Sequence, residues 1–169
     1  MKILALDSSG LVASAAVVED DVLIAEYTTD YKKTHSQTLL PMLDEIRQMI
    51  DLDLHTIDAI AISAGPGSFT GLRIGAATAK GLGLALNLPL VEVPTLAFNL
   101  WGTDKLVCPI MDARRNQVYT GIYEFCKAEA EAGSCEQQLV MHCLKDQCAS
   151  PVDELVDELN RLGREVIFL

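Results

Sequence analysis

The chain has 169 residues, of which half are hydrophobic and 22% are charged, and its formal net charge is −11. This composition is typical of a globular protein with one large domain or two small lobes, and it excludes an intrinsically disordered chain. No basic cluster is longer than a pair, which argues against a protein that binds nucleic acid unaided. Because no segment resembles a signal peptide or a membrane span, we expect a cytoplasmic protein with no membrane partner.

The first part of the chain predicts three strands followed by alternating helices and strands. The expected elements, in chain order, are strands over 3–7, 13–18 and 22–27, a helix over 34–50, a strand over 57–62, a helix over 72–86, a strand over 90–93 and a short helix over 94–101. Thr34 and Gln37 form a candidate capping box at the start of the first helix. This order predicts a mixed sheet with helices packed on it.

The sequence pattern predicts that a second lobe begins near residue 103. Strands are expected over 107–111, 118–125 and 138–143, with a polar hairpin loop over 128–137. A helix follows, with Ser150 as its N-cap, Pro151 at its first position and Gly163 at its end. The last predicted strand, 166–169, ends the sequence, and because domains rarely end in an apolar strand we expect this lobe to be incomplete at its C-terminus.

Five cysteines are present, and none of them forms a C-x-x-C pair: Cys108, Cys126, Cys135, Cys143 and Cys148. In a cytosolic protein such thiols are expected to stay reduced. A zinc site that combines His142 with three of these cysteines is a minor alternative, because the spacing matches no standard zinc module.

The stretch SAGPGSFTGLRIGAATAKG, residues 63–81, is a glycine-rich turn followed by a predicted helix. Thr70 stands where both the P-loop and the G-x-G-x-x-G motif require glycine, so neither motif matches. Ser68 directly follows Gly67, which also excludes the spacing of a nucleophile elbow. The remaining chemical alternative is a phosphate held by the free N–H groups at the start of the helix.

The helix over 72–86 is apolar on almost every side, since Arg73 and Lys80 are its only charged residues. Such a helix must be covered on two sides, either within its own fold or by another protein, and we favour a partner. We therefore predict a four-helix contact, made by this helix and the helix over 36–50 with the same pair of a partner subunit. The isolated chain is expected to form a homodimer through the same face. The predicted interface residues are Leu39, Leu43, Ile46, Leu72, Gly75, Ala76, Ala79 and Gly83.

Four segments of the chain resemble, in the same order, those of the bacterial TsaB family, also called YeaZ. They are ILALDS (3–8), THSQTLLP (34–41), GPGSFTGLRIG (65–75) and DARRNQVY (112–119), of which the third is the specific element. The resemblance covers nearly the whole chain. It implies an α/β fold of the actin/Hsp70-like ATPase (ribonuclease H-like) class, with two related lobes of mixed sheets and flanking helices. The lobes are expected over 1–102 and 103–169.

The resemblance also implies a function. TsaB-type proteins are non-catalytic scaffold or activator subunits that bind the related enzyme TsaD, which modifies the adenosine beside the tRNA anticodon with threonylcarbamoyl. TsaC and TsaE act in the same system, and tRNA is reached only through the complex. TsaD carries a metal-binding histidine pair after the strand that follows its glycine turn, whereas the matching residues here, 93–98, contain no histidine. We therefore expect no bound metal and no catalytic residue.

Asp7 and Ser8, after the first strand, match the turn that faces nucleotide phosphates in actin-like proteins. They are candidates for a vestigial nucleotide contact, and capping of the turn by Asp7 is the simpler alternative. We expect no cofactor, with ATP or ADP bound only weakly or at the interface with the partner. Two other functions stay open: an independent ATP-dependent enzyme of the actin-like class, and a glycopeptidase-like hydrolase, for which we find neither a nucleophile nor metal ligands.

Overall fold

The computed structural model of the chain describes residues 1–30, 34–97, 105–127 and 139–169. These residues form two units, Met1–Thr95 and Leu96–Leu169, each with its own sheet. The boundary expected at residues 102/103 falls among residues 98–104, outside the described part, so the exact division into 1–102 and 103–169 stays a prediction. Within the described part, no helix is long and apolar enough to cross a membrane.

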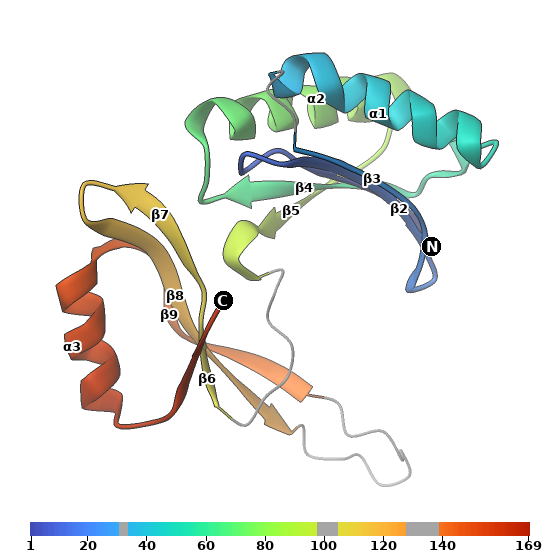
Figure 1. The fold of residues 1–169 in the computed structure, drawn as a ribbon. Helices are drawn as coiled ribbons and strands as arrows, with labels where there is room; N and C mark the ends of the chain where they lie inside the picture. The colour runs from blue at the N-terminus through green and yellow to red at the C-terminus, as the bar shows by residue number, and fades with distance from the viewer. Residues whose placement is uncertain (31–33, 98–104, 128–138) are drawn as a thin grey trace, which may run out of the picture. The chain divides into compact units, whose positions relative to one another are not determined.

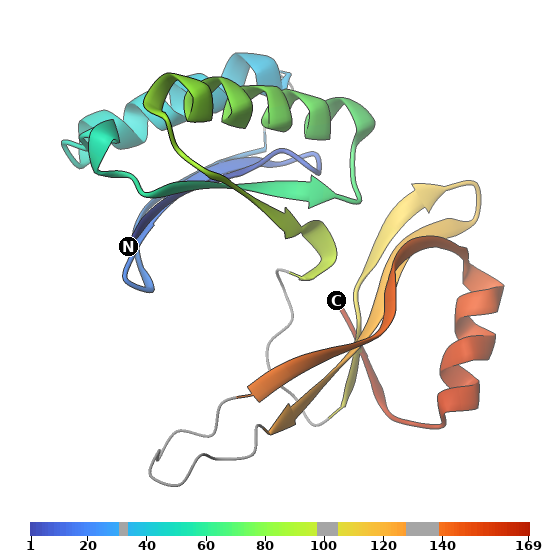
Figure 2. The same ribbon diagram turned by 180° about the vertical axis from the view of Figure 1, so that it is seen from behind.

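The sheet of the first unit has the strand order β3-β2-β1-β4-β5. β1, β2 and β3 are antiparallel neighbours, whereas β4 and β5 run parallel to β1. Two helices, α1 and α2, lie side by side on one face of this sheet (Figures 1 and 2). The bounds are β1 Lys2–Asp7, β2 Ala13–Glu19, β3 Val22–Thr29, α1 His35–Met49, β4 Ala59–Gly65, α2 Phe69–Leu86 and β5 Leu90–Pro94. The sequence predicted all seven elements, with small differences at their ends.

The core of the first unit lies between this sheet and the two helices. Leu4 and Leu6 alternate with partly exposed residues along β1, as the period of two in a half-buried strand requires. Leu4 pairs in register with Val17 on one side and with Ile60 on the other, and all three side chains are fully buried. The apolar stripe of α1 covers them with its four buried residues, Leu39, Met42, Leu43 and Ile46.

The two helices begin differently from what their sequences predicted. Thr34 is the N-cap of α1, but its hydroxyl lies 3.0 Å from the Ser36 hydroxyl and caps no backbone N–H. The predicted capping box with Gln37 is therefore wrong, because the Gln37 N–H donates to the carbonyl of Thr34 instead. α2 begins at Phe69, three residues before its predicted start, because the Ser68 side chain accepts the N–H of Gly71 at 3.2 Å.

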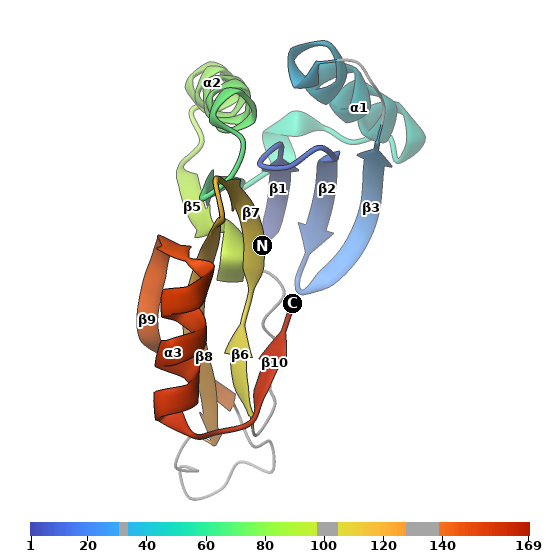
Figure 3. The same cartoon turned by 60° about the vertical axis from the view of Figure 1, so that its left-hand side comes forward.

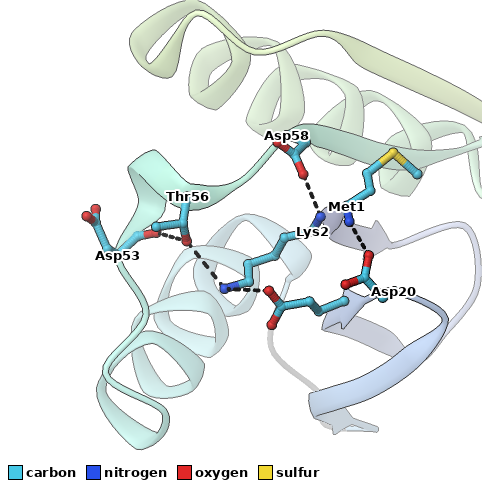
Figure 4. Close-up of polar contacts among 7 residues, drawn as sticks. Met1, Lys2, Asp20, Asp53, Thr56 and Asp58 are labelled. Atoms are coloured by element: carbon cyan, nitrogen blue, oxygen red, sulfur yellow. Dashed lines mark hydrogen bonds and ion pairs between the residues drawn. The ribbon is translucent and has the colours of Figure 1, made fainter.

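A polar network fastens the amino end of β1 to the turns around it (Figure 4). The terminal ammonium of Met1 pairs with Asp20 in the β2–β3 turn. The Lys2 N–H donates to the Asp58 carboxylate at 2.7 Å, and its ammonium lies 3.5 Å from the Thr56 hydroxyl. These contacts are exposed, so each contributes little to stability, and their effect is to align β1 with its neighbours.

The second unit also has one sheet, in the order β10-β6-β8-β7, with β9 paired to β8. Helix α3 packs on one face of this sheet (Figure 3), and the ion pair between Lys145 of β9 and Glu158 of α3 fastens it there. The bounds are β6 Leu106–Cys108, β7 Ile110–Arg114, β8 Gln117–Lys127, β9 Leu139–Pro151, α3 Val152–Leu162 and β10 Val166–Phe168.

Three details of the second unit and of the segment before it differ from the sequence analysis. β9 runs on to Pro151 rather than ending near 143, because its residues continue to pair with β8. Ser150 is therefore a strand residue opposite Val118, and Pro151 is the N-cap of α3 in its place. In place of the expected short helix over 94–101, the structure has a 3-10 turn at Thr95–Ala97, and residues 98–101 lie outside the described part. The predicted hairpin loop over 128–137 also lies outside the described residues.

The two units repeat one topology. In each, three antiparallel strands are followed by a helix and then by a strand parallel to the first: β4 beside β1 in the first unit, and β10 beside β6 in the second. β6 and β7 together correspond to β1, so the order β9-β8-β6/β7-β10 matches β3-β2-β1-β4. The repeat confirms the expected fold class: an actin-like α/β fold of two related lobes with mixed sheets and flanking helices.

Candidate functional site

The glycine turn after β4 is bonded to the loop after β1. The Ser68 N–H donates to the carbonyl of Ser9 at 2.6 Å, and the Ser8 hydroxyl donates to the carbonyl of Gly71 at 2.9 Å. Ser8 is fully buried at this contact. Since the N–H groups of Ser68 and Gly71 already have protein acceptors, the turn offers few free donors to an anion, which weighs against the phosphate alternative.

Two glycines of the turn are explained by this close approach of backbones. A Cβ on Gly67 would lie 2.5 Å from the carbonyl oxygen of Ser9, and a Cβ on Gly71 would lie 2.0 Å from that of Ser8. No side chain fits at either distance, because the neighbouring atoms belong to the backbone. The glycine pattern therefore serves to dock α2 against the first loop.

The two candidates for a nucleotide contact, Asp7 and Ser8, both have partners within the protein. One carboxylate oxygen of Asp7 accepts the Ser9 N–H at 2.9 Å and the Ser63 hydroxyl at 2.6 Å. These bonds fit the simpler alternative, in which Asp7 shapes the turn and joins it to β4. A nucleotide contact by either residue stays a prediction.

Six of the eight predicted interface residues are buried inside the first unit. Leu39, Leu43 and Ile46 pack under α1 in the core, and Gly75, Ala79 and Gly83 lie on the buried side of α2. A Cβ on Gly75 would lie 2.5 Å from the Ser8 hydroxyl oxygen, which leaves no space for a partner. Burial of these six residues weighs against a direct partner contact, because the small residues allow α2 to approach its own sheet. The interface itself stays a prediction.

The other two predicted residues, Leu72 and Ala76, and the buried Gly83 border open grooves along α2. Leu72 and Ala76 line a groove of about 290 Å³ beside β4 and β5, which also holds the charged side chains of Arg73 and Glu92. Gly83 lines a second groove, of about 410 Å³, at the carboxyl end of the helix. These two grooves leave the side of α2 toward β5 accessible over much of the helix length.

The sequence analysis missed the most exposed apolar residues of α2. Phe69 is 69% exposed at the first position of the helix, and Leu84 is 87% exposed near its end. The guanidinium carbon of Arg73 lies 3.6 Å from the centre of the Phe69 ring, a cation–π contact that covers part of the ring. The N-cap preference of Ser68 was the signal that would have brought Phe69 into the helix. We name the exposed side formed by Phe69, Arg73, Ala77 and Leu84 the outer side of α2.

The second unit contains a buried thiol. Burial raises the pKa of Cys108, whose sulfur lies 3.2 Å from the Thr120 hydroxyl. Cys126, Cys143 and Cys148 are exposed free thiols, and Cys135 lies outside the described residues. Among residues 1–30, 34–97, 105–127 and 139–169, no three His, Cys, Asp or Glu side chains come close enough to hold a metal ion.

Cys108 is expected to resist a thiol reagent in the folded protein at pH 8, on the order of 100-fold more than Cys148. Its raised pKa keeps it protonated at this pH, and burial blocks access. Mass spectrometry of the labelled peptides over time measures both rates, and unfolding in urea provides the control in which the two cysteines react alike. Equal labelling in the native protein would contradict the described packing between β6 and α3.

Two comparisons by sequence place the chain among proteins of tRNA modification. The family model "TsaD: tRNA N6-adenosine threonylcarbamoyltransferase" matches residues 23–142. The chain is 41% identical to the tRNA threonylcarbamoyladenosine biosynthesis protein TsaB of Bacillus subtilis, over 100% of this chain and 70% of that protein. It is 37% identical to the protein of the same name from Escherichia coli, over 73% of this chain and 55% of that protein.

A solved structure shows the same fold. The chain is similar to YeaZ from Pseudomonas aeruginosa with a TM-score of 0.70 and 29% identity, over 89% of this chain and 66% of that one. The chain therefore spans between about half and about 70% of the length of these relatives. The residues that the family model matches, 23–142, include the glycine turn and α2.

Proposed function

The chain belongs to the TsaB family, and from this premise we propose that it is the non-catalytic partner of a TsaD-type subunit in the synthesis of threonylcarbamoyladenosine in tRNA. In this role it scaffolds or activates the enzyme, while TsaC and TsaE act in the same pathway. The transfer of the threonylcarbamoyl group itself is assigned to the TsaD-type subunit.

The observation that carries the proposal is the outer side of α2. Phe69 and Leu84 expose large apolar side chains at opposite ends of one helix, and open grooves adjoin the helix at Leu72–Ala76 and at its carboxyl end. Exposed apolar area costs about 25 cal/mol per Å² relative to burial, so such a side is typical of a surface that another protein covers. A partner helix laid along α2 would bury both residues together.

The available side chains support a non-catalytic role. Residues 93–97, which match the place of the histidine pair in TsaD, run Val-Pro-Thr-Leu-Ala. Thr95 instead accepts the N–H of Gly65 at 3.1 Å and so helps to hold the glycine turn. A net charge of −11 also favours a protein that meets tRNA through a complex rather than alone.

Threonylcarbamoyl transfer to tRNA tests the proposal when it is measured with the TsaD-type subunit, with this chain, and with both. We expect transfer to be at least about tenfold faster with both proteins than with the TsaD-type subunit alone, because the partner helps to assemble an active complex. Transfer by this chain alone would overturn the non-catalytic assignment. A TsaD-type subunit that is equally active without the chain would overturn the role as partner.

Calorimetric titration of the isolated chain with ATP and magnesium provides the control for the alternative, an ATP-dependent enzyme. Because Asp7 and Ser8 are already bonded within the protein, we expect no binding in the micromolar range. Tight binding by the isolated chain would favour that alternative over the scaffold role.

A further inference from the structure

The turn between β7 and β8 has an unusual backbone for the residues that form it. Arg114, Arg115 and Asn116 have φ angles of 66°, 55° and 60°, all in the left-handed region. Glycine and asparagine adopt this region readily, whereas arginine has no preference for it. Asn or Gly at all three positions would give this turn less backbone strain. The two arginines therefore suggest a functional role for their side chains.

The turn is held in place from both sides. The Arg114 N–H donates to the Asp112 carboxylate at 2.7 Å, and the carbonyl of Asn116 accepts the first N–H of α3, from Val152, at 3.4 Å. Both bonds use backbone groups of the turn, so the two arginine side chains are left exposed at its tip. These bonds fix the backbone of the turn, and the turn presents two positively charged side chains to solvent.

These two cations differ from most others in the described part of the chain. There, five ion pairs neutralise Lys2, Arg47, Lys105, Lys145 and Arg164. Neither the Arg114 nor the Arg115 guanidinium group has a carboxylate within 4.0 Å among the described residues, although acidic residues outnumber basic ones 24 to 13 in the sequence. Two adjacent unpaired guanidinium groups are therefore a local exception in an acidic protein.

We propose that Arg114 and Arg115, presented by this turn, bind neighbouring backbone phosphates of RNA. Guanidinium groups pair with phosphate oxygens in a bidentate manner, and an asparagine amide such as that of Asn116 is a further common phosphate contact. Two adjacent cations at the end of a turn can contact two successive phosphates of a nucleic-acid backbone. The identity of the RNA, a tRNA, rests on the proposed function, whereas the contact itself does not.

The double variant Arg114→Asn/Arg115→Asn tests the contact. Asparagine tolerates a positive φ, so the turn is kept while two charges are removed. In the complex with the TsaD-type subunit, we expect tRNA binding to weaken about tenfold near 0.1 M salt. The slope of log K against log salt concentration should fall by about 1.4 to 1.8, the value for two phosphates.

A second double variant, Arg161→Gln/Arg164→Gln, removes the same charge from two other exposed residues of the second unit. Arg161 lies in the last turn of α3 and Arg164 just after that helix, whereas the β7–β8 turn contacts Val152 at its first residue. Arg164 pairs with Glu124, and both substitutions keep a polar side chain. If this variant lowers the slope as much as the first, only net charge matters and the local contact is overturned. If the asparagine variant instead loses the partner protein with no RNA present, the tip is a protein contact and the proposal also fails.

Titration of the isolated chain with a short RNA separates this proposal from the proposed function. The side-chain N–H signals of the arginines are followed by NMR at low salt, where weak contacts are detected. Shifts at Arg114 and Arg115 support the contact even if no complex with the TsaD-type subunit forms. Unmoved signals, together with an unchanged salt slope in an active complex, overturn the contact and leave the scaffold role intact.

Discussion

Replacement of Gly71 by alanine is expected to destabilise the first unit by about 3 kcal/mol or more. The added Cβ would lie 2.0 Å from the carbonyl oxygen of Ser8, so either α2 or the loop after β1 must move. Movement of either breaks the bonds of Ser8 to Gly71 and of Ser68 to Ser9. Urea unfolding followed by circular dichroism measures the change.

Gly81→Ala is the matched control on the same helix. A Cβ at Gly81 meets no atom within 4 Å, and the residue is exposed within α2. Alanine favours a helix over glycine by about 1 kcal/mol, so this variant is expected to be more stable than the parent. Equal stability of the Gly71→Ala and Gly81→Ala variants would show that α2 does not dock on the first loop as described.

The substitution Ala79→Glu tests the same packing of α2, because Ala79 is fully buried on the side of this helix that faces the sheet. A carboxylate there would be desolvated with no counter-ion, so we expect loss of the folded first unit rather than loss of a partner alone. A variant that melts like the parent and only fails to bind a partner would instead place Ala79 on an exposed interface.

Leu84→Glu is expected to weaken association with the TsaD-type subunit by about 30-fold or more, while the melting temperature stays unchanged. Leu84 is 87% exposed in the chain, so a charge there costs nothing in the monomer. In a complex it would be buried against an apolar partner surface, and central apolar residues of interfaces contribute about 2 kcal/mol or more. Phe69→Ser should act in the same direction.

Val156→Glu provides the control for this second result. Val156 is also an exposed apolar residue on a helix, 48% accessible on α3 in the second unit, and it lies outside the proposed interface. Sedimentation of each variant with the partner measures the affinities. The same experiment on the chain alone tests the proposed homodimer, which Leu84→Glu should also disrupt. If Leu84→Glu binds like the parent, the outer side of α2 is not the interface.

Much of this fold could be predicted from local patterns in the sequence. The alternation around Leu4 and Leu6 and the apolar stripe of α1 each indicate one type of element, because a single face of each is buried. The repeat of three strands and a helix follows from the order of these elements. Element ends were less certain, since hydrogen bonds decide them: Ser68 caps α2, whereas Thr34 leaves α1 without a side-chain cap.

The same reasoning could not find the orientation of α2. The side of a helix that faces the core is usually read from its polar residues, but α2 is apolar on nearly every side, so its sequence carries no such signal. The small residues Gly75 and Ala79 were compatible with close packing on a partner or on the protein itself. Only the structure shows Ser8 and Ile62 against Gly75, which turns Leu84 outward.

The sequence by itself determined the family and the class of fold, through the GPGSFTGLRIG turn and the order of the elements. Only the tertiary structure decided which residues are available to other molecules. The physical reason is that exposure is set by contacts between segments far apart in the chain. The carbonyl of Ser8, 63 residues before Gly71, is what makes glycine necessary there, and no window of sequence around the turn contains it.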